Sequence, residues 1–139
     1  MITGDLIHPQ LLAALASAAH GSKILLSDGN FPHGTGAAAG ATRIYLNVSP
    51  GLLTVDQVLT LLIPVVPIEA AEIMSPPDWL DVPAITGYRA ALDGVPFTGH
   101  ERFAFYEAAR HPDVAIVVAT GDVRVYSNLL LTIGVRQPG

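Results

Sequence analysis

Short apolar runs alternate with amphipathic segments along the chain, and this alternation predicts the secondary structure. Apolar runs with β-branched residues are typical of buried strands, and they occur at residues 23–27, 43–48, 69–74, 114–118 and 129–133. Apolar positions at helical spacing predict helices over residues 9–21, 54–63, 88–92 and 100–110. Strands that alternate with helices imply a three-layer α/β domain.

Local signals place the helix ends and one loop. Pro9 fits the first position of a helix of about three turns that has His20 at its C-terminus. Thr54 and Gln57 have the spacing of a capping box, in which each side chain binds a free backbone N–H group. Residues 29–40 are rich in Gly, Pro and Ala, which predicts an irregular loop.

The composition indicates one domain that assembles with copies of itself. A length of 139 residues is typical of a single domain, so we expect residues 1–139 to fold as one unit. Hydrophobic residues make up 50% of the chain and charged residues 14%, against about 25% charged residues in an average domain. So little charge leaves apolar surface for subunit contacts, and we expect a homo-oligomer.

Charge, cysteine content and the start of the chain exclude several classes of protein. The net charge of −5 and the scattered Lys and Arg residues argue against nucleic-acid binding. The chain has no cysteine, which excludes disulfides and thiolate catalysis and fits a cytoplasmic location. Residues 1–5 lack the basic region of a signal peptide, and the apolar run at residues 59–68 is too short to span a bilayer. We therefore expect a soluble protein with no membrane partner.

Two patterns resemble cofactor sites but lack the context that such sites need. Residues 34–39 match a dinucleotide-binding motif, but Pro32 and His33 separate them from the preceding strand. Asp56, at about the distance of a ribose-binding acid, reads instead as the first turn of a helix. The histidines lack metal-ligand spacing; they are His8, His20, His33, His100 and His111. We expect no metal and no nucleotide cofactor.

Polar side chains at the ends of apolar elements are candidates for a site, because they can converge on a cleft. His20 is our candidate acid–base, since an imidazole pKa of about 6.5 puts both protonation states within reach. Asp28 would hold a ligand hydroxyl or orient the imidazole, and Arg102 offers a planar fork of donors. Tyr126 and Asn128, two apart on an extended segment, would point to the same side.

Each of these residues also has a purely structural explanation. His20 would interact favourably with the dipole of a helix that ends beside it, and Asp28 suits a turn. Arg102 suits a solvated helix start, and Tyr126 and Asn128 suit the last turn before a strand. Taken one at a time, the residues leave both explanations open.

Several blocks of sequence, in order and over almost the whole chain, resemble the fucose mutarotase and ribose pyranase family. The first, from Ala19 to Pro32, resembles the His-Gly…Ser-Asp-x-x-Phe-Pro signature of fucose mutarotases. The later blocks are Arg-Phe-Ala-Phe-Tyr-Glu at residues 102–107, Thr-Gly-Asp at 120–122, and Tyr-Ser-Asn at 126–128 before three leucines.

The resemblance implies a small cofactor-free mutarotase, an isomerase that interconverts the ring forms of a free monosaccharide by general acid–base chemistry. It also implies a Rossmann-like layered fold assembled as a ring, a decamer of two pentameric rings, with active sites where neighbouring subunits meet. His20 is then the proton donor. The residues that would contact the sugar are Asp28, Arg102, Tyr126 and Asn128.

The identity of the sugar stays open between fucose and other aldoses. Ribose pyranases place a histidine where the fucose enzymes rely on an arginine, and this chain has both, His100 and Arg102. The blocks that contain Phe31 and Tyr106 favour L-fucose. The aromatic residues that could pack on the apolar face of the sugar are Phe31, Phe103 and Tyr106. A D-ribose pyranase, a sugar-binding protein without turnover and a structural ring subunit are the alternatives. The loop at residues 34–42 is expected to reshape the pocket mouth.

Overall fold

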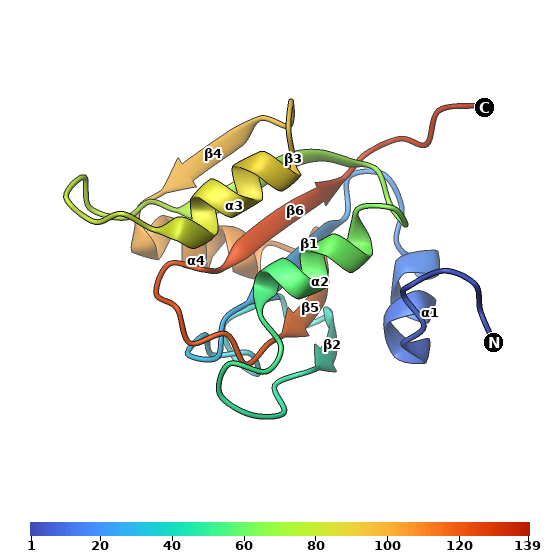
Figure 1. Cartoon of the computed structure of the whole chain (residues 1–139), viewed down its shortest axis with the longest axis horizontal. Helices are drawn as coiled ribbons and strands as arrows, with labels where there is room; N and C mark the ends of the chain where they lie inside the picture. The colour runs from blue at the N-terminus through green and yellow to red at the C-terminus, as the bar shows by residue number, and fades with distance from the viewer.

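The computed structural model describes residues 1–139 and shows a six-stranded mixed sheet with helices on both faces (Figure 1). The helices are α1 (Pro9–Ser17), α2 (Val55–Leu62), α3 (Pro83–Ala91) and α4 (Arg102–Arg110). The strands are β1 (Lys23–Ser27), β2 (Thr42–Tyr45), β3 (Ile68–Met74), β4 (Phe97–His100), β5 (Val114–Ala119) and β6 (Leu129–Ile133). The expected three-layer α/β fold is confirmed.

The strands lie in the order β2-β5-β1-β6-β3-β4. Their directions decide which segments meet at each of the two edges of the sheet where strands begin and end. β6 runs antiparallel to both of its neighbours, whereas the other strands run parallel to one another. The segments that follow β1 to β5 therefore emerge at the same edge as the segment that precedes β6, and we call this the carboxyl edge. The segment before β1 lies at the opposite, amino edge.

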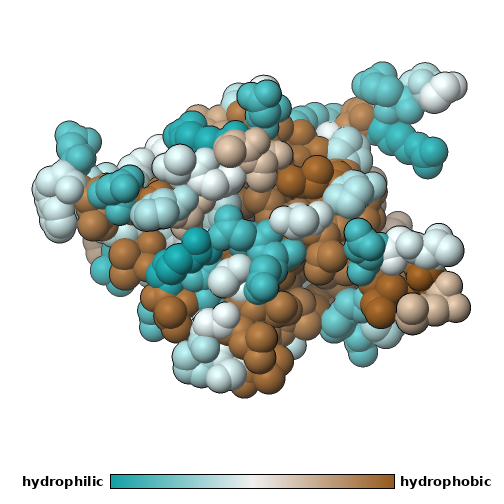
Figure 2. Space-filling view, in the orientation of Figure 1, coloured by the Kyte–Doolittle hydropathy of each residue, from teal (hydrophilic) through white to brown (hydrophobic).

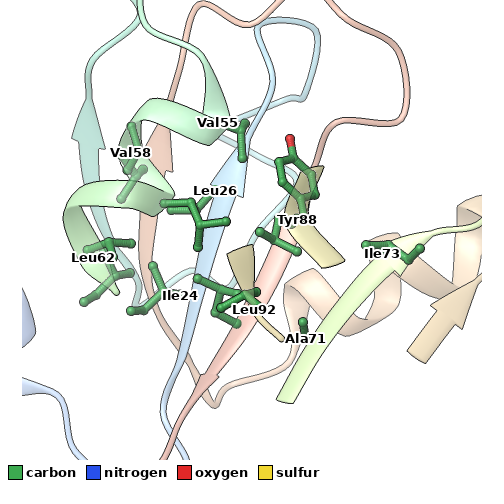
Figure 3. Close-up of a cluster of buried hydrophobic side chains, with 14 of the residues drawn as sticks. Ile24, Leu26, Val55, Val58, Leu62, Ala71, Ile73, Tyr88 and Leu92 are labelled. Atoms are coloured by element: carbon green, nitrogen blue, oxygen red, sulfur yellow. The ribbon is translucent and has the colours of Figure 1, made fainter. Parts of the chain in front are cut away.

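The larger core lies on the sheet face that α1, α2 and α3 cover. Ile24 and Leu26 of β1 point to this face, because alternate residues of a strand point the same way, and they pack with helix residues such as Leu62 (Figure 3). The Tyr88 ring of α3 lies at one end of this cluster, and its hydroxyl points away from the labelled aliphatic side chains (Figure 3). Because its members come from distant parts of the chain, this core holds the helices to the sheet.

The opposite face carries a smaller core under α4 and under the loop after β1. Leu25 of β1 packs there with Phe105 of α4 and with Ala38 of the loop. The Arg43 guanidinium donates to loop carbonyl oxygens at 2.8–3.3 Å, those of His33, Ala37, Ala38 and Ala41. The irregular loop is confirmed, and the glycine-rich segment leads into β2 with no helix after it. A dinucleotide-binding motif would need that helix.

The expected helix at residues 9–21 is too long. α1 ends at Ser17, because Ala18 takes an extended conformation with φ −83° and ψ 160°. His20 therefore lies beyond the helix, in a turn that Gly21 completes with a positive φ of 86°. The helix-dipole explanation for His20 loses its basis, since the dipole effect is confined to the last turn.

Other boundaries differ in the middle of the chain. The helix expected at residues 88–92 begins earlier, with Pro83 in its first turn. The helix expected at residues 100–110 is preceded by β4, which was missed because it is four residues long, contains Gly99 and alternates weakly. The capping box of α2 is confirmed by hydrogen bonds between Thr54 and Gln57 at 2.9 and 3.3 Å.

Apolar side chains remain exposed on the single chain. Hydrophobic residues lie between hydrophilic ones on the face that α2 and α3 form (Figure 2). Exposed apolar side chains also include Trp79 after β3, and Val123 and Val125 before β6. None of the helices has the length and apolar character needed to cross a membrane.

Candidate active site

A pocket of about 240 Å³ opens at the carboxyl edge, between α4 and the segments that adjoin β1, β3 and β6. Its lining combines polar groups with apolar side chains: Asp28, Asn30, Phe31, Met74, Arg102, Tyr106, Val125, Tyr126 and Asn128. Pockets for drug-sized ligands measure about 300–1,000 Å³. This smaller pocket therefore suits a smaller molecule. In open α/β sheets, ligands bind at this edge of the strands.

Asp28 is held rigidly at the end of β1. The residue is only 5% exposed, and its Oδ1 atom accepts hydrogen bonds from the backbone N–H groups of Asn30 at 3.0 Å and Phe31 at 2.9 Å. These bonds close the turn after β1, so the structural explanation for Asp28 is correct. The same turn aims the carboxyl group at the pocket.

The environment of Asp28 raises the pKa of its carboxyl group. Burial raises the pKa of this carboxyl, and the backbone N–H groups of Asn30 and Phe31 lower it in part. The nearby Asp122 carboxylate adds to the rise, and the pKa lies above its ordinary value. A ligand hydroxyl that donates to this carboxylate would replace hydration that burial has removed.

Asn128 lies beside Asp28 because β6 runs antiparallel next to β1. Its Oδ1 atom accepts the backbone N–H of Asp28 at 2.8 Å, across 100 positions of sequence. The amide carbonyl is thereby used, and the NH₂ group remains free to donate to a ligand. The prediction that Asn128 contributes an amide to the site agrees with this geometry.

The backbone at Tyr126 differs from the expected extended conformation. The segment is not extended, because Tyr126 lies in a turn with a positive φ of 56°. Simple alternation therefore does not explain why Tyr126 and Asn128 share a side. The turn itself brings the Tyr126 ring into the pocket lining.

Arg102 and two aromatic rings form the wall on the α4 side. Arg102 is the first residue of α4, after Glu101, whose carboxylate accepts the Ala104 N–H at 2.7 Å as the helix cap. The Arg102 guanidinium lies 5.8 Å from the centre of the Tyr106 ring, and Tyr106 lies 5.7 Å from Phe31. This wall offers cationic donors beside apolar ring faces.

His20 lies at the amino edge, apart from the other predicted residues. Its Nε2 atom is 3.1 Å from Glu69 Oε1, and its side chain is 57% exposed. The whole of β1, five residues long, lies between His20 and Asp28, and the strand alone spans roughly 16 Å at about 3.3 Å per residue. One chain does not bring His20 to the pocket, so the pocket of a single chain lacks the expected proton donor.

His100 is also absent from the pocket lining, although it ends β4 two residues before Arg102. Its Nε2 atom lies 2.8 Å from Glu72 Oε1, and the other oxygen of Glu72 accepts from Lys23 Nζ at 2.9 Å. This network directs His100 toward the sheet. Of the two residues that point to different sugars, the pocket contains the arginine.

Sequence reasoning missed part of the lining and misplaced two features. Asn30, Met74 and Val125 were missed, although each adjoins a predicted residue or ends a strand. Phe103 is 71% exposed and does not line the pocket. The loop at residues 34–42 does not line the pocket either, because its alanines pack on the sheet.

Comparison with known proteins agrees with this site and fold. The RbsD / FucU transport protein family matches residues 1–136. The chain is 36% identical to the fucose mutarotase of Bos taurus, over 96% of this chain and 92% of that protein. It is 32% identical to the D-ribose pyranase of Paracidovorax citrulli, over 94% and 95%.

Two solved structures share the architecture. The fucose mutarotase of Streptococcus pneumoniae, in complex with L-fucose, superposes with a TM-score of 0.79 at 26% identity, over 94% of this chain and 95% of that one. Bacillus subtilis RbsD, complexed with D-ribose, superposes with a TM-score of 0.86 at 20% identity, over 99% and 100%. With this fold, a pocket at the carboxyl edge and these relatives, the chain belongs to the RbsD / FucU family and is a sugar mutarotase, an isomerase.

Proposed function

We propose that this protein interconverts the anomers of free L-fucose by general acid–base catalysis in the carboxyl-edge pocket. One observation carries the proposal: a buried carboxyl, a free amide NH₂ group and a guanidinium line the same small pocket as three aromatic rings. Hydroxyl groups of a sugar pair with the polar side chains, and its C–H faces pack on the rings. A free monosaccharide has both kinds of surface.

The lining favours a deoxyhexose over a pentose. Met74, Phe31 and Val125 supply apolar surface, where a methyl group such as that of L-fucose gains by leaving water. Arg102 lines the pocket, whereas His100 is turned toward Glu72. The fucose mutarotase structure in complex with L-fucose supports the same choice. D-ribose is the second candidate, because the RbsD structure with D-ribose shares the fold.

The reaction needs two proton transfers. A base takes the proton of the anomeric hydroxyl, the bond between C1 and the ring oxygen breaks, and the ring oxygen takes a proton from an acid. The open aldehyde then recloses on its other face with the transfers reversed. Asp28 is the carboxyl in the pocket, and its raised pKa suits it to hold or accept a hydroxyl proton.

We assign the acid to His20 of a second copy of the chain. His20 lies at the amino edge with its imidazole largely in solvent, so a neighbouring copy that packs edge to edge would bring it to the pocket. Exposed Val123 and Val125 beside the pocket supply apolar surface for that contact. A ring, and a decamer of two pentameric rings, satisfies this arrangement in every copy. We place the protein in the cytoplasm.

A shared site can be tested by mixing two inactive variants. His20→Ala and Asp28→Asn proteins are prepared separately, dissociated and reassembled in equal amounts, and L-fucose anomer exchange is followed by NMR magnetisation transfer. Sites between random neighbours should regain about a quarter of wild-type activity, since each needs one intact residue from each copy. A site within one chain would regain none.

The same measurement ranks the sugars and tests the enzyme itself. Wild type is assayed with L-fucose and D-ribose, and His111→Ala serves as a matched control, because His111 is exposed and pairs only with Asp113. Faster exchange of L-fucose than of D-ribose supports the proposal. The rival, a sugar-binding protein without turnover, would show sugar binding in titrations but no acceleration of exchange with either sugar.

A further inference from the structure

The segment at residues 121–128, which we call the strap, supplies much of the pocket without regular secondary structure of its own. It carries Val125, Tyr126 and Asn128 into the lining. At its start, a side chain at Gly121 would collide with the carbonyl oxygens of Ser49 and Leu52. A segment of this kind needs specific contacts to hold one conformation.

Arg124 ties the strap to itself and to α2. Its Nε atom donates to Asp122 Oδ1 at 3.0 Å, and one terminal nitrogen donates to Asp122 Oδ2 at 2.6 Å and to Asp56 Oδ2 at 2.5 Å. Asp56 lies in the first turn of α2, 68 positions away. The Arg124 guanidinium therefore bridges the carboxylates of Asp122 and Asp56, which lie on different segments.

Asp122 extends this connection into the core. It is 1% exposed, and its carboxylate also accepts the backbone N–H of Val55 at the start of α2, at 3.0 Å. Burial alone would raise the pKa of this carboxyl, but the hydrogen bonds from Arg124 and Val55 outweigh burial and hold the pKa below its usual value. The ion pair is thus present throughout the neutral pH range.

A second anchor comes from α3. The buried Tyr88 hydroxyl donates to the carbonyl oxygen of Ser127 at 2.8 Å, and the Ser127 hydroxyl donates to the carbonyl oxygen of Arg124 at 2.7 Å. In Figure 3 the Tyr88 hydroxyl points out of the apolar cluster, as this contact requires. Tyr126 lies between the two anchors.

Tyr126 is the strap residue whose conformation depends most on these two anchors. Its positive φ is unfavourable for a bulky side chain, so an unanchored strap would relax toward ordinary backbone conformations. That relaxation would move the Tyr126 ring out of the lining and shift Asn128, which follows two residues later.

From this geometry we infer that Arg124 is a positioning residue, which holds the strap in the conformation that presents Tyr126 and Asn128 to the sugar. The inference rests on the proposed function, and it adds a residue that does not line the pocket. Tyr88 is the second positioning residue, acting through Ser127. Neither residue touches the sugar in this arrangement.

The test compares Arg124→Met, Arg124→Lys and Tyr88→Phe with wild type, and Arg110→Met is the control because Arg110 is exposed near the end of α4 and pairs only weakly with Glu107. KM and kcat for L-fucose are measured by magnetisation transfer, and the melting temperature is recorded. Arg124→Met should raise KM about tenfold. Arg124→Lys should recover part of that loss, because a lysine keeps the charge but cannot bridge both carboxylates.

A double-mutant cycle separates positioning from general stability. If Arg124 acts through Tyr126, then Arg124→Met should cost about tenfold less in a Tyr126→Phe background than in wild type. Additive effects would overturn the inference, and so would an Arg124→Met protein with unchanged KM and kcat. If Arg124→Met fails to assemble, Tyr88→Phe decides: a raised KM supports the inference, and wild-type kinetics overturn it.

Failure of the inference differs from failure of the proposed function. Wild-type protein that does not accelerate exchange would overturn the function, and the inference with it. Wild-type protein that is active, together with strap variants that behave like the Arg110→Met control, would overturn the inference alone.

Discussion

The two edges of the sheet differ in how each holds its candidate catalytic residue. At the carboxyl edge, Asp28 is buried and fixed by backbone hydrogen bonds, with Asn128 bound to it. At the amino edge, His20 is exposed and pairs with Glu69. The carboxyl edge therefore contains a pocket, whereas the amino edge presents an imidazole that lies outside this pocket in its own chain.

This difference follows from strand direction. Parallel strands bring the segments after them to one edge, so a residue that precedes β1 is directed to the other edge. A chain of this topology cannot supply both residues to one site, whereas two copies packed edge to edge can. Under the proposed function, in which both residues act on one sugar, catalysis therefore requires at least two copies of the chain.

The largest expected effect is at the amino edge. His20→Ala should slow L-fucose exchange by about 10²–10⁴-fold, the usual contribution of a general acid–base group. Sugar affinity should change little, because the pocket lining stays intact, and the exposed position predicts an unchanged melting temperature. NMR exchange and calorimetric titration measure the two quantities. Wild-type exchange in this variant would remove His20 from the mechanism.

At the carboxyl edge, Asp28→Asn should remove the proposed base and with it most of the exchange activity. It should also weaken sugar binding by about tenfold, since a hydrogen bond to a charged group contributes about 1.5–3 kcal/mol. The free energy of unfolding of this variant should rise at neutral pH. Because the pKa of Asp28 is raised in the folded protein, the folded state binds protons more readily than the unfolded one, and wild-type stability falls as pH rises above about 4.

The Asp28→Asn protein should lack this pH-dependent loss of stability. Thermal melts from pH 4 to pH 7, compared with wild type, measure it. A variant that loses more stability than wild type as pH rises to 7 would contradict the assigned pKa direction.

A smaller effect is expected at the rim of the pocket. Arg102→Met should raise KM severalfold, because an exposed guanidinium is partly screened by water and salt. Arg110→Met is the control on the same helix. Equal kinetics in the two variants would show that Arg102 is only a solvated residue at the helix start.

The smallest effect concerns His33, which lies in neither edge site. Burial lowers the pKa of His33, and its Nδ1 atom lies 2.8 Å from the Ser27 hydroxyl. The folded state then binds fewer protons than the unfolded one, so stability should rise with pH in the window below about 6.5 and level off above it. Denaturant titrations of wild type and His33→Gln would test this. Identical pH slopes would remove His33 as the cause.

Several elements were within reach of the sequence because their causes are local. The Thr54–Gln57 capping box, the apolar run of β5 and the turn at Asp28 each depend on residues close together in the chain. The family blocks also pointed to Asp28, Arg102, Tyr126 and Asn128, and the structure places all of these in one pocket.

The remaining features depend on contacts between distant segments. β4 is short and weakly patterned, and it forms a strand because it pairs with β3. The contact between Asp28 and Asn128 spans 100 positions, and that between Arg124 and Asp56 spans 68. No local pattern encodes such pairs, since packing and strand order bring them together.

Taken by itself, the sequence determined the apolar elements, the layered fold class and the residue types available for acid–base chemistry. Only the tertiary structure decided which of those residues meet. The antiparallel placement of β6 set Asn128 against Asp28, and the parallel strands sent His20 to the far edge. Local propensity acts over a few neighbouring residues, whereas the site arises from strand pairing and from the burial of faces that lie far apart in the chain.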